Sequence, residues 1–154
     1  MAAVTIAMQT WIGFVDLHRK PEASGGYFLG RDLTFNGAKH SIRVGAGFYT
    51  DGVTIPRPLR WWVDPYSGGY LAAAIIHDGL YAAQRLPRRD ADAIFLEAML
   101  SCDVRPSKAW TMWAGVRLFG GCAWRHNRER RQHMRTYVHV TRQPRDGHAA
   151  QALR

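Results

Sequence analysis

Short apolar runs separated by turn residues fill the first part of the chain. Four of these runs are rich in β-branched and aromatic residues, a composition typical of strands. Asn36 and Gly37 stand between the last two runs, and both residues tolerate the positive φ angles of a tight hairpin. The pattern predicts a small N-terminal antiparallel sheet of three to four strands. The runs are residues 11–15, 27–29, 33–35 and 41–44.

The apolar positions then recur with the period of a helix. Residues 70–84 are Ala-rich and apolar on most faces, which indicates a buried central helix. Pro87 opens a second helix, and Ser107 is the expected N-cap of a third. A last, basic helix is expected over 122–137 and a polar tail over 141–154. The apolar residues at helical spacing are Ile94, Phe95, Ala98 and Met99 in the second helix and Trp110, Trp113, Ala114 and Leu118 in the third.

Residues 45–69, rich in Gly and Pro, are expected to form an ordered loop that carries one short helix at 58–63. The strands and the helical patterns after them predict an α+β fold, in which the sheet is followed by a bundle of three to four helices. With 154 residues the chain has room for one domain. We assign residues 1–121 to this domain and 122–154 to a basic C-terminal helix and tail that is not a separate domain.

The positive charge of the chain is concentrated near its C-terminus. The net charge is +9, and from Arg117 onward nine Arg stand against Glu129 and Asp146. Such a segment favours anionic partners, namely nucleic acid, acidic protein surfaces or phospholipid headgroups, with a solvated Arg-rich helix as the alternative. Four arginines are spaced so that one helix face can hold several of them as contacts for nucleic acid or another anionic partner. They are Arg125, Arg128, Arg131 and Arg135.

Cysteine usage and hydropathy narrow the class of protein further. Cys102 and Cys122 are far apart in apolar contexts, so we expect two buried thiols rather than a disulfide or a metal pair. Residues 1–8 lack the basic start of a secretory signal. The longest apolar run, 71–76, is far shorter than the roughly 20 residues of a membrane span. We expect a protein without a transmembrane segment, made in the cytoplasm.

The candidate chemistry begins with His77 and Asp78 inside the apolar central helix. An ionisable pair in such a helix costs free energy unless each member has a partner. Tyr81 lies one turn after His77 and offers a hydroxyl on the same face. A core histidine with satisfied hydrogen bonds is the alternative to a catalytic one.

Two further carboxylates are candidates for the same site. If the two helices form a hairpin across residues 85–87, Asp92 faces His77, fixes its tautomer and raises its basicity, as in His-based general-base chemistry. The alternative for Asp92 is a first-turn residue that favours the helix dipole. Asp51 lies in the loop, held by Gly52 and Pro56, either as a metal ligand or as a cap of local backbone amides.

Three motifs occur in order along the chain: residues 48–57 (FYTDGVTIPR), 74–81 (AIIHDGLY) and Arg88 with 91–99 (ADAIFLEAM). Together they resemble an uncharacterised family of phage and prophage proteins known as domain of unknown function 1353, and the likeness extends to 116–120. It covers roughly residues 10–121. The resemblance implies a phage context and no particular activity.

The helix also resembles, more locally, the His-Asp helix of phospholipase A2-like enzymes. That likeness implies that His77 is the general base, that Asp92 orients it, that Tyr81 bonds Asp92 and that Asp78 ligates calcium. This chain departs from those enzymes in lacking their disulfides, and only residues 44–47 or 51–52 could take the place of their Gly-rich calcium loop. Calcium takes six to eight oxygen ligands.

The same residues allow other interpretations. Asp51, His77 and either Asp78 or Asp92 could bind zinc for amide hydrolysis, as in a cell-wall amidase or peptidase. Alternatively the His-Asp-Tyr-Asp set is a buried hydrogen-bonded network in a protein that works through its surfaces. We favour the second view, a phage- or prophage-encoded accessory or structural protein of tail or head assembly. Its expected partners are phage structural proteins or copies of itself, and its expected locations are the host cytoplasm and the virion.

Overall fold

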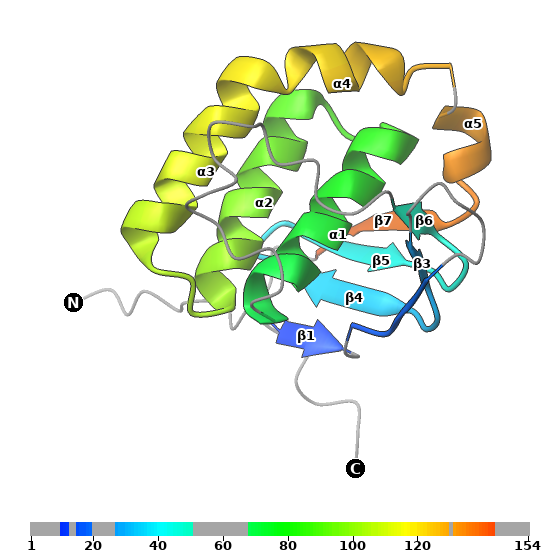
Figure 1. Ribbon diagram of the computed structural model, residues 1–154, viewed down its shortest axis with the longest axis horizontal. Coiled ribbons are helices and arrows are strands. Elements are labelled where there is room, and N and C mark those ends of the chain that lie inside the picture. Colours follow the sequence, from blue (N-terminus) through cyan, green and yellow to red (C-terminus); the bar gives the residue numbers. More distant parts are fainter. Residues whose placement is uncertain (1–9, 13–14, 20–26, 51–67, 130, 144–154) are drawn as a thin grey trace.

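The residues that the structure describes form two antiparallel sheets and five helices, and the helices lie on one side of the larger sheet (Figure 1). The computed structural model describes residues 10–12, 15–19, 27–50, 68–129 and 131–143. An α+β fold with an N-terminal antiparallel sheet is therefore confirmed. The expected helix at 58–63 lies outside the described residues.

The larger sheet has four strands in the order β1-β4-β5-β7, and the smaller one has three in the order β2-β3-β6. Every neighbouring pair is antiparallel. The larger sheet consists of β1 (Thr10–Ile12), β4 (Leu33–Asn36), β5 (His40–Val44) and β7 (Val138–Arg142). The smaller sheet consists of β2 (Leu17–Arg19), β3 (Tyr27–Leu29) and β6 (Tyr49–Thr50).

The β4–β5 hairpin forms at the predicted turn. The Gly37 amide donates to the His40 carbonyl at 2.9 Å, which closes the turn. In β4 and β5 alternate side chains point inward, as the two-residue period of a strand requires. The inward set is fully buried and makes the sheet's contribution to the core: Leu33, Phe35, Ile42 and Val44.

The C-terminal segment departs from its prediction. Residues 141 and 142, expected to begin a polar tail, instead end strand β7 (Val138–Arg142), which pairs with β5 from His40↔Arg142 to Val44↔Val138. Val138 is completely buried. The chain therefore returns to its first hairpin after all the helices have formed, and residues 138–142 belong to the core of the domain.

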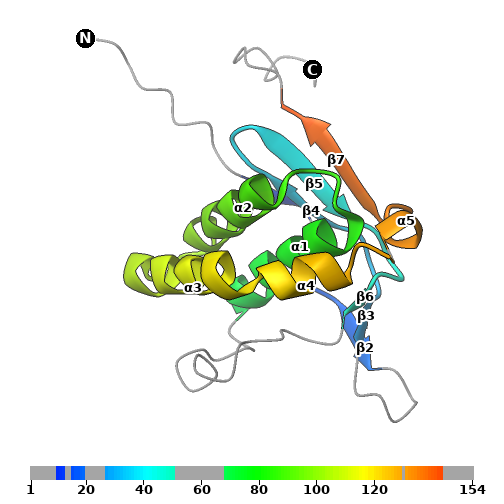
Figure 2. The ribbon, with the colours of Figure 1, turned by 90° about the horizontal axis from the view of Figure 1, so that it is seen from above.

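Three long helices lie in two layers over the larger sheet (Figure 2). Helix α1 contacts β4, β5 and β7, and α2 packs beside α1. Helix α3 packs on α2, and the short α4 follows it end to end on the side away from the sheet. The helices are α1 (Gly68–Ala83), α2 (Arg88–Ser101), α3 (Pro106–Phe119), α4 (Gly121–His126) and α5 (Arg131–Met134).

Helix α3 starts and packs differently from its prediction. Its N-cap is Arg105 rather than Ser107, because Pro106 occupies the first helical position, where a missing N–H is harmless. Its buried residues are Ala109, Met112 and Gly115. Small side chains at this contact let α3 lie close to α2. Of the apolar residues that stood out in the sequence, Trp110 and Leu118 are exposed and Trp113 and Ala114 only partly buried.

The single basic helix expected over 122–137 is replaced by two short helices. Arg85 donates to the Arg135 carbonyl at 2.8 Å and to the Val138 carbonyl at 2.6 Å. These bonds hold the segment against the end of α1 and direct it back toward the sheet, which a straight helix would prevent.

The expectation for the cysteines also needs correction. Both thiols are free, but Cys122 is exposed and Cys102 only partly buried.

Candidate functional site

Asp92 is the centre of a buried polar network between three helices. It lies in the second turn of α2 and has no exposed surface. Its Oδ1 accepts a hydrogen bond from the Tyr81 hydroxyl at 2.6 Å and lies 3.1 Å from His77 Nε2. Since the carboxylate can only accept, Nε2 carries the proton and donates. The predicted meeting of residues 77 and 92 between two packed helices is confirmed.

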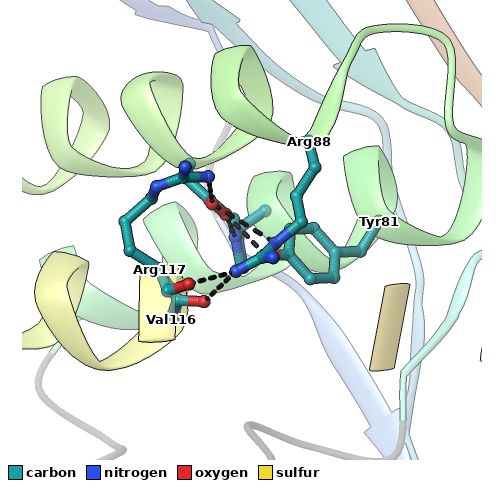
Figure 3. A network of polar contacts seen from close by, with 6 residues as sticks. Tyr81, Arg88, Val116 and Arg117 are labelled. Atoms are coloured by element: carbon teal, nitrogen blue, oxygen red, sulfur yellow. Dashed lines mark hydrogen bonds and ion pairs between the residues drawn. The ribbon is translucent and has the colours of Figure 1, made fainter. Parts of the chain in front are cut away.

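Two arginines contact the other carboxylate oxygen of Asp92, Oδ2. Arg117, from α3, donates to Asp92 Oδ2 at 2.7 Å, and Arg88 Nε lies 3.6 Å from the same atom. Figure 3 shows Arg88 reaching across to α3, where its guanidinium donates to the carbonyls of Val116 and Arg117. Arg88 Nε also donates to the Tyr81 hydroxyl at 3.2 Å. The network thus joins α1, α2 and the C-terminal end of α3.

Helical spacing explains why these side chains converge. His77 and Tyr81 are one turn apart on α1, and Arg88 and Asp92 are one turn apart on α2. The turn after α1 places the two pairs face to face. The His77 ring makes tilted contacts with two aromatic rings: its centroid lies 4.2 Å from that of Tyr81 and 4.5 Å from that of Phe95.

Sequence reasoning did not assign Arg88, Arg117 or Gly120 to the site. Arg88 could have been found from its i,i+4 spacing to Asp92, whereas Arg117 meets Asp92 only through tertiary packing. Gly120 is needed because a Cβ there would lie 2.6 Å from the Tyr81 hydroxyl and 2.5 Å from the Val116 carbonyl. A side chain at position 120 would collide with the network.

The environment fixes the protonation states of the network. Burial lowers the pKa of His77, and the neighbouring Arg88 adds to this effect, while the hydrogen bond to Asp92 opposes it. Burial tends to raise the pKa of Asp92, but hydrogen bonds from His77, Tyr81 and Arg117 outweigh burial and hold that pKa below its usual value. Burial, followed by the bond to Asp92, raises the pKa of Tyr81. The network at neutral pH contains a neutral imidazole, a phenol and an ionised carboxylate.

These shifts predict a loss of stability in acid. His77 has a pKa below that of the unfolded chain, 6.5, so the folded state resists a proton that the unfolded state accepts. The contribution of His77 to the free energy of unfolding is complete above pH 6.5 and is lost as the pH falls toward the pKa of the folded state. The lowered pKa of Asp92 adds a second loss of stability below pH 3.8. Urea unfolding at a series of pH values should show this slope in the native chain. It should be shallower in His77→Gln and unchanged in His139→Gln, an exposed position; equal slopes in all three would contradict the assignment.

The predicted metal ligands are only partly placed. Asp51 lies outside the described residues. Asp78 Oδ2 accepts a hydrogen bond from the buried Thr50 hydroxyl at 3.0 Å, which ties the end of β6 to α1. Within the described ranges no group of three or more His, Cys, Asp or Glu side chains is arranged to hold a metal ion. The described residues therefore do not by themselves form a calcium or zinc site.

The four arginines proposed for an anionic partner do not share one helix face. Arg125 lies in α4, Arg128 in the following turn, Arg131 at the start of α5 and Arg135 after its end. Arg125 and Arg128 are exposed. Arg135 donates instead to the carbonyls of Ala83 and Gln84 at 3.1 and 3.3 Å. A guanidinium at the last carbonyls of α1 stabilises the end of that helix.

The sequence of the chain matches one known protein family. Residues 27–116 match the model of a family described as proteins of unknown function, DUF1353. The chain belongs to the DUF1353 family. The matched DUF1353 region runs from β3 to the last turns of α3, so it contains His77, Tyr81, Arg88 and Asp92, while Arg117 follows it directly. Neither a curated protein nor a solved structure matches the chain significantly.

No helix in the described part of this DUF1353 chain is both long and apolar enough to cross a bilayer.

Proposed function

We propose that the chain is a phage- or prophage-encoded accessory or structural protein of virion assembly, in which the Asp92 network fixes the helices rather than performing a reaction. The phage context rests on the three motifs shared with the family. The host cytoplasm during synthesis, and then the virion, are the locations that follow. Other phage structural proteins or further copies of this chain are the expected partners.

The observation that supports the architectural role is that both carboxylate oxygens of Asp92 accept hydrogen bonds within the protein. This fully buried carboxylate of α2 accepts hydrogen bonds from side chains of α1 and α3, and Arg88 of α2 forms an ion pair with it. In general-base chemistry a carboxylate raises the basicity of its histidine. Here burial lowers the pKa of His77 and outweighs the hydrogen bond to Asp92, whose charge is shared with two guanidinium groups. The arrangement suits a fixed connection between helices better than proton transfer near neutral pH.

Particle fractionation and elemental analysis test the proposal together. We expect the tagged full-length chain to copurify with particles of the phage that encodes it, at a constant ratio to the major capsid protein. We also expect the purified chain to sediment as a multimer or with a virion protein and to contain no stoichiometric metal. A monomer that carries a stoichiometric cation and stays out of the particles would refute the assembly role.

A hydrolase is the second candidate, and the tautomer of His77 is the observation that favours it. Because Nε2 donates to Asp92, the lone pair of the neutral imidazole resides on Nδ1. Nδ1 is then the atom able to take a proton from water as it attacks an ester or amide carbonyl. The imidazolium would return that proton to the leaving group. Tyr81 and Asp92 would act as positioning residues for the ring.

Activity assays on two substrate classes distinguish this candidate. Mixed phosphatidylcholine–phosphatidylglycerol vesicles and purified peptidoglycan are incubated with the chain in the presence of calcium or zinc. A hydrolase would release fatty acid or new amino groups, and His77→Ala would abolish the release while circular dichroism shows a retained fold. His139→Ala, at an exposed position on β7, is the control. No release by the native chain, or equal release by His77→Ala, excludes the candidate.

A further inference from the structure

The last elements of the chain are held in place by few buried side chains. We call residues 131–142 the α5–β7 segment, which runs from helix α5 through strand β7 at the edge of the larger sheet (Figure 2). Val138 is the one buried residue between positions 131 and 142. Met134, Tyr137 and Val140 pack against the core but stay partly exposed. Segments with few buried apolar contacts open at a lower free energy than the rest of a domain.

Hydrogen bonds to backbone carbonyls supply much of what fixes this segment to α1. Arg85, which follows α1, donates to the carbonyls of Arg135 and Val138. In the other direction, Arg135 donates to the carbonyls of Ala83 and Gln84. Every copy of the chain carries the same donors and acceptors. The same bonds can therefore form when the segment belongs to a second copy.

The connection that leads into the segment is exposed. Helix α4 ends at His126, and residues 127–129 form a turn in which Arg128 and Glu129 are exposed. A change of backbone direction in an exposed turn breaks few contacts. The α5–β7 segment can thus leave its place while the three long helices and their Asp92 network stay intact.

The vacated edge of β5 fits strand β7 in particular. The two strands pair over five positions, from His40↔Arg142 to Val44↔Val138. Val138 packs closely on α1 at Gly79, where a Cβ would lie 3.4 Å from the Val138 side chain and 2.9 Å from that of Val44. The register and this close approach select the β7 sequence over an unrelated strand.

We propose that copies of this chain exchange their α5–β7 segments, so that β7 of one copy completes the larger sheet of another. The inference rests on the proposed function, which names further copies of the chain as partners. Within one chain, the short connection keeps β7 near its own β5 at an effective concentration on the order of millimolar, which favours the closed monomer in dilute solution. Copies held together in a particle approach that concentration. Exchange then links them through contacts that the monomer already contains.

The register of β5 and β7 offers a position for a disulfide between two copies. The Gln143 amide donates to the Lys39 carbonyl at 2.8 Å, so the next pair, His40↔Arg142, is a non-hydrogen-bonded pair. In such pairs the Cα atoms lie about 4.5 Å apart. This separation allows a disulfide to form.

Crosslinking of full-length chains tests the exchange. In a background with Cys102→Ser and Cys122→Ser, His40→Cys chains are mixed with Arg142→Cys chains at about millimolar concentration and oxidised mildly. We expect covalent heterodimers to accumulate in native buffer, because each disulfide traps one exchanged pair. A double variant with both cysteines in one chain should crosslink within itself in dilute solution, which confirms that the geometry permits the bond.

A second substitution links the rate of exchange to the opening of the segment. Arg85→Gln should raise the rate of heterodimer formation about tenfold, because two hydrogen bonds from its guanidinium no longer hold the segment in place. The control is Arg89→Gln, which changes an exposed arginine of α2 and should leave the rate unchanged. Circular dichroism should show the native fold in both variants.

Three results would overturn the exchange. The first is no heterodimer although the double variant crosslinks within one chain. The second is an equal yield when Arg125→Cys, at an exposed position on α4, replaces Arg142→Cys, since random collision then explains the bond. The third is a heterodimer that forms only in urea sufficient to unfold the whole chain.

Particle fractionation is read separately from the crosslinking. A chain that enters particles without forming the heterodimer refutes the exchange and leaves the assembly role standing. A chain that forms the heterodimer but stays out of particles refutes the assembly role and leaves the exchange standing.

Discussion

Replacing Asp92 with Ala should destabilise the protein by about 3 to 4 kcal/mol, because removing one member of a buried charged group leaves its partners unpaired. Tyr81 and His77 would lose their acceptor, and the guanidinium groups of Arg88 and Arg117 would face each other without a carboxylate between them. The side chains of these arginines are 25% and 35% exposed, so water offsets part of the loss. For a chain of this length, the melting temperature should fall by roughly 10 °C.

Two further variants sharpen the measurement. Asp92→Asn keeps the shape and one carbonyl oxygen and should lose less stability than Asp92→Ala. Asp90→Ala removes a first-turn carboxylate from the same helix, and only its interaction with the helix dipole, worth under about 1 kcal/mol, should be lost. Urea unfolding of the three variants should give this order. A loss in Asp92→Ala no larger than in Asp90→Ala would show that the network does not hold the helices.

The second large effect is expected for Gly120→Ala, which should destabilise the protein by about 2 to 3 kcal/mol through overpacking. The backbone at Gly120 is in the helical region, with φ −68° and ψ −9°, so intrinsic propensity alone would favour Ala. The new Cβ would nevertheless lie 2.6 Å from the Tyr81 hydroxyl and 2.5 Å from a backbone carbonyl, and neither can retreat easily. Thermal and urea unfolding measure the effect.

The neighbouring glycine supplies the control for this experiment. In Gly121→Ala the nearest atom is one nitrogen of the Arg88 guanidinium, 3.2 Å from the new Cβ, a contact that a shift of a few tenths of an ångström relieves. Gly121→Ala should therefore cost clearly less stability than Gly120→Ala, whose new Cβ meets atoms at 2.5 and 2.6 Å. Tyr81→Phe should reduce the additional cost of Gly120→Ala when the two are combined, because the colliding hydroxyl is gone. Additive effects of the two changes would argue against contact between positions 81 and 120.

Elements that depend on local spacing could be predicted from the sequence. The β4–β5 hairpin follows from Asn36 and Gly37, and the pairing of His77 with Asp92 follows from two helices joined by a short turn. The α+β class and the extents of the three long helices follow from the change of period along the chain. In each case a few neighbouring residues determine the outcome.

Features that depend on distant partners could not be predicted. Strand β7 pairs with β5 across all the intervening helices, and this distant edge could not be predicted even though Val138, Val140 and Thr141 form a short β-branched run within the basic segment. The apolar stripe of α3 was identified but not its direction, since size alone does not show that Ala109 and Gly115 are the packing residues. Arg117 joins the site from 25 residues beyond Asp92, a separation at which no local pattern operates.

The position of β7 also sets the order in which the protein can be completed during synthesis. The β4–β5 hairpin leaves the ribosome early, but the strand that covers the outer edge of β5 is made about a hundred residues later. Until then β5 presents unpaired backbone amides and carbonyls, the kind of edge that recruits strands from other chains. The edge of β5 is therefore open to aberrant association while the helices emerge, until β7 pairs with it and becomes the last strand of the sheet.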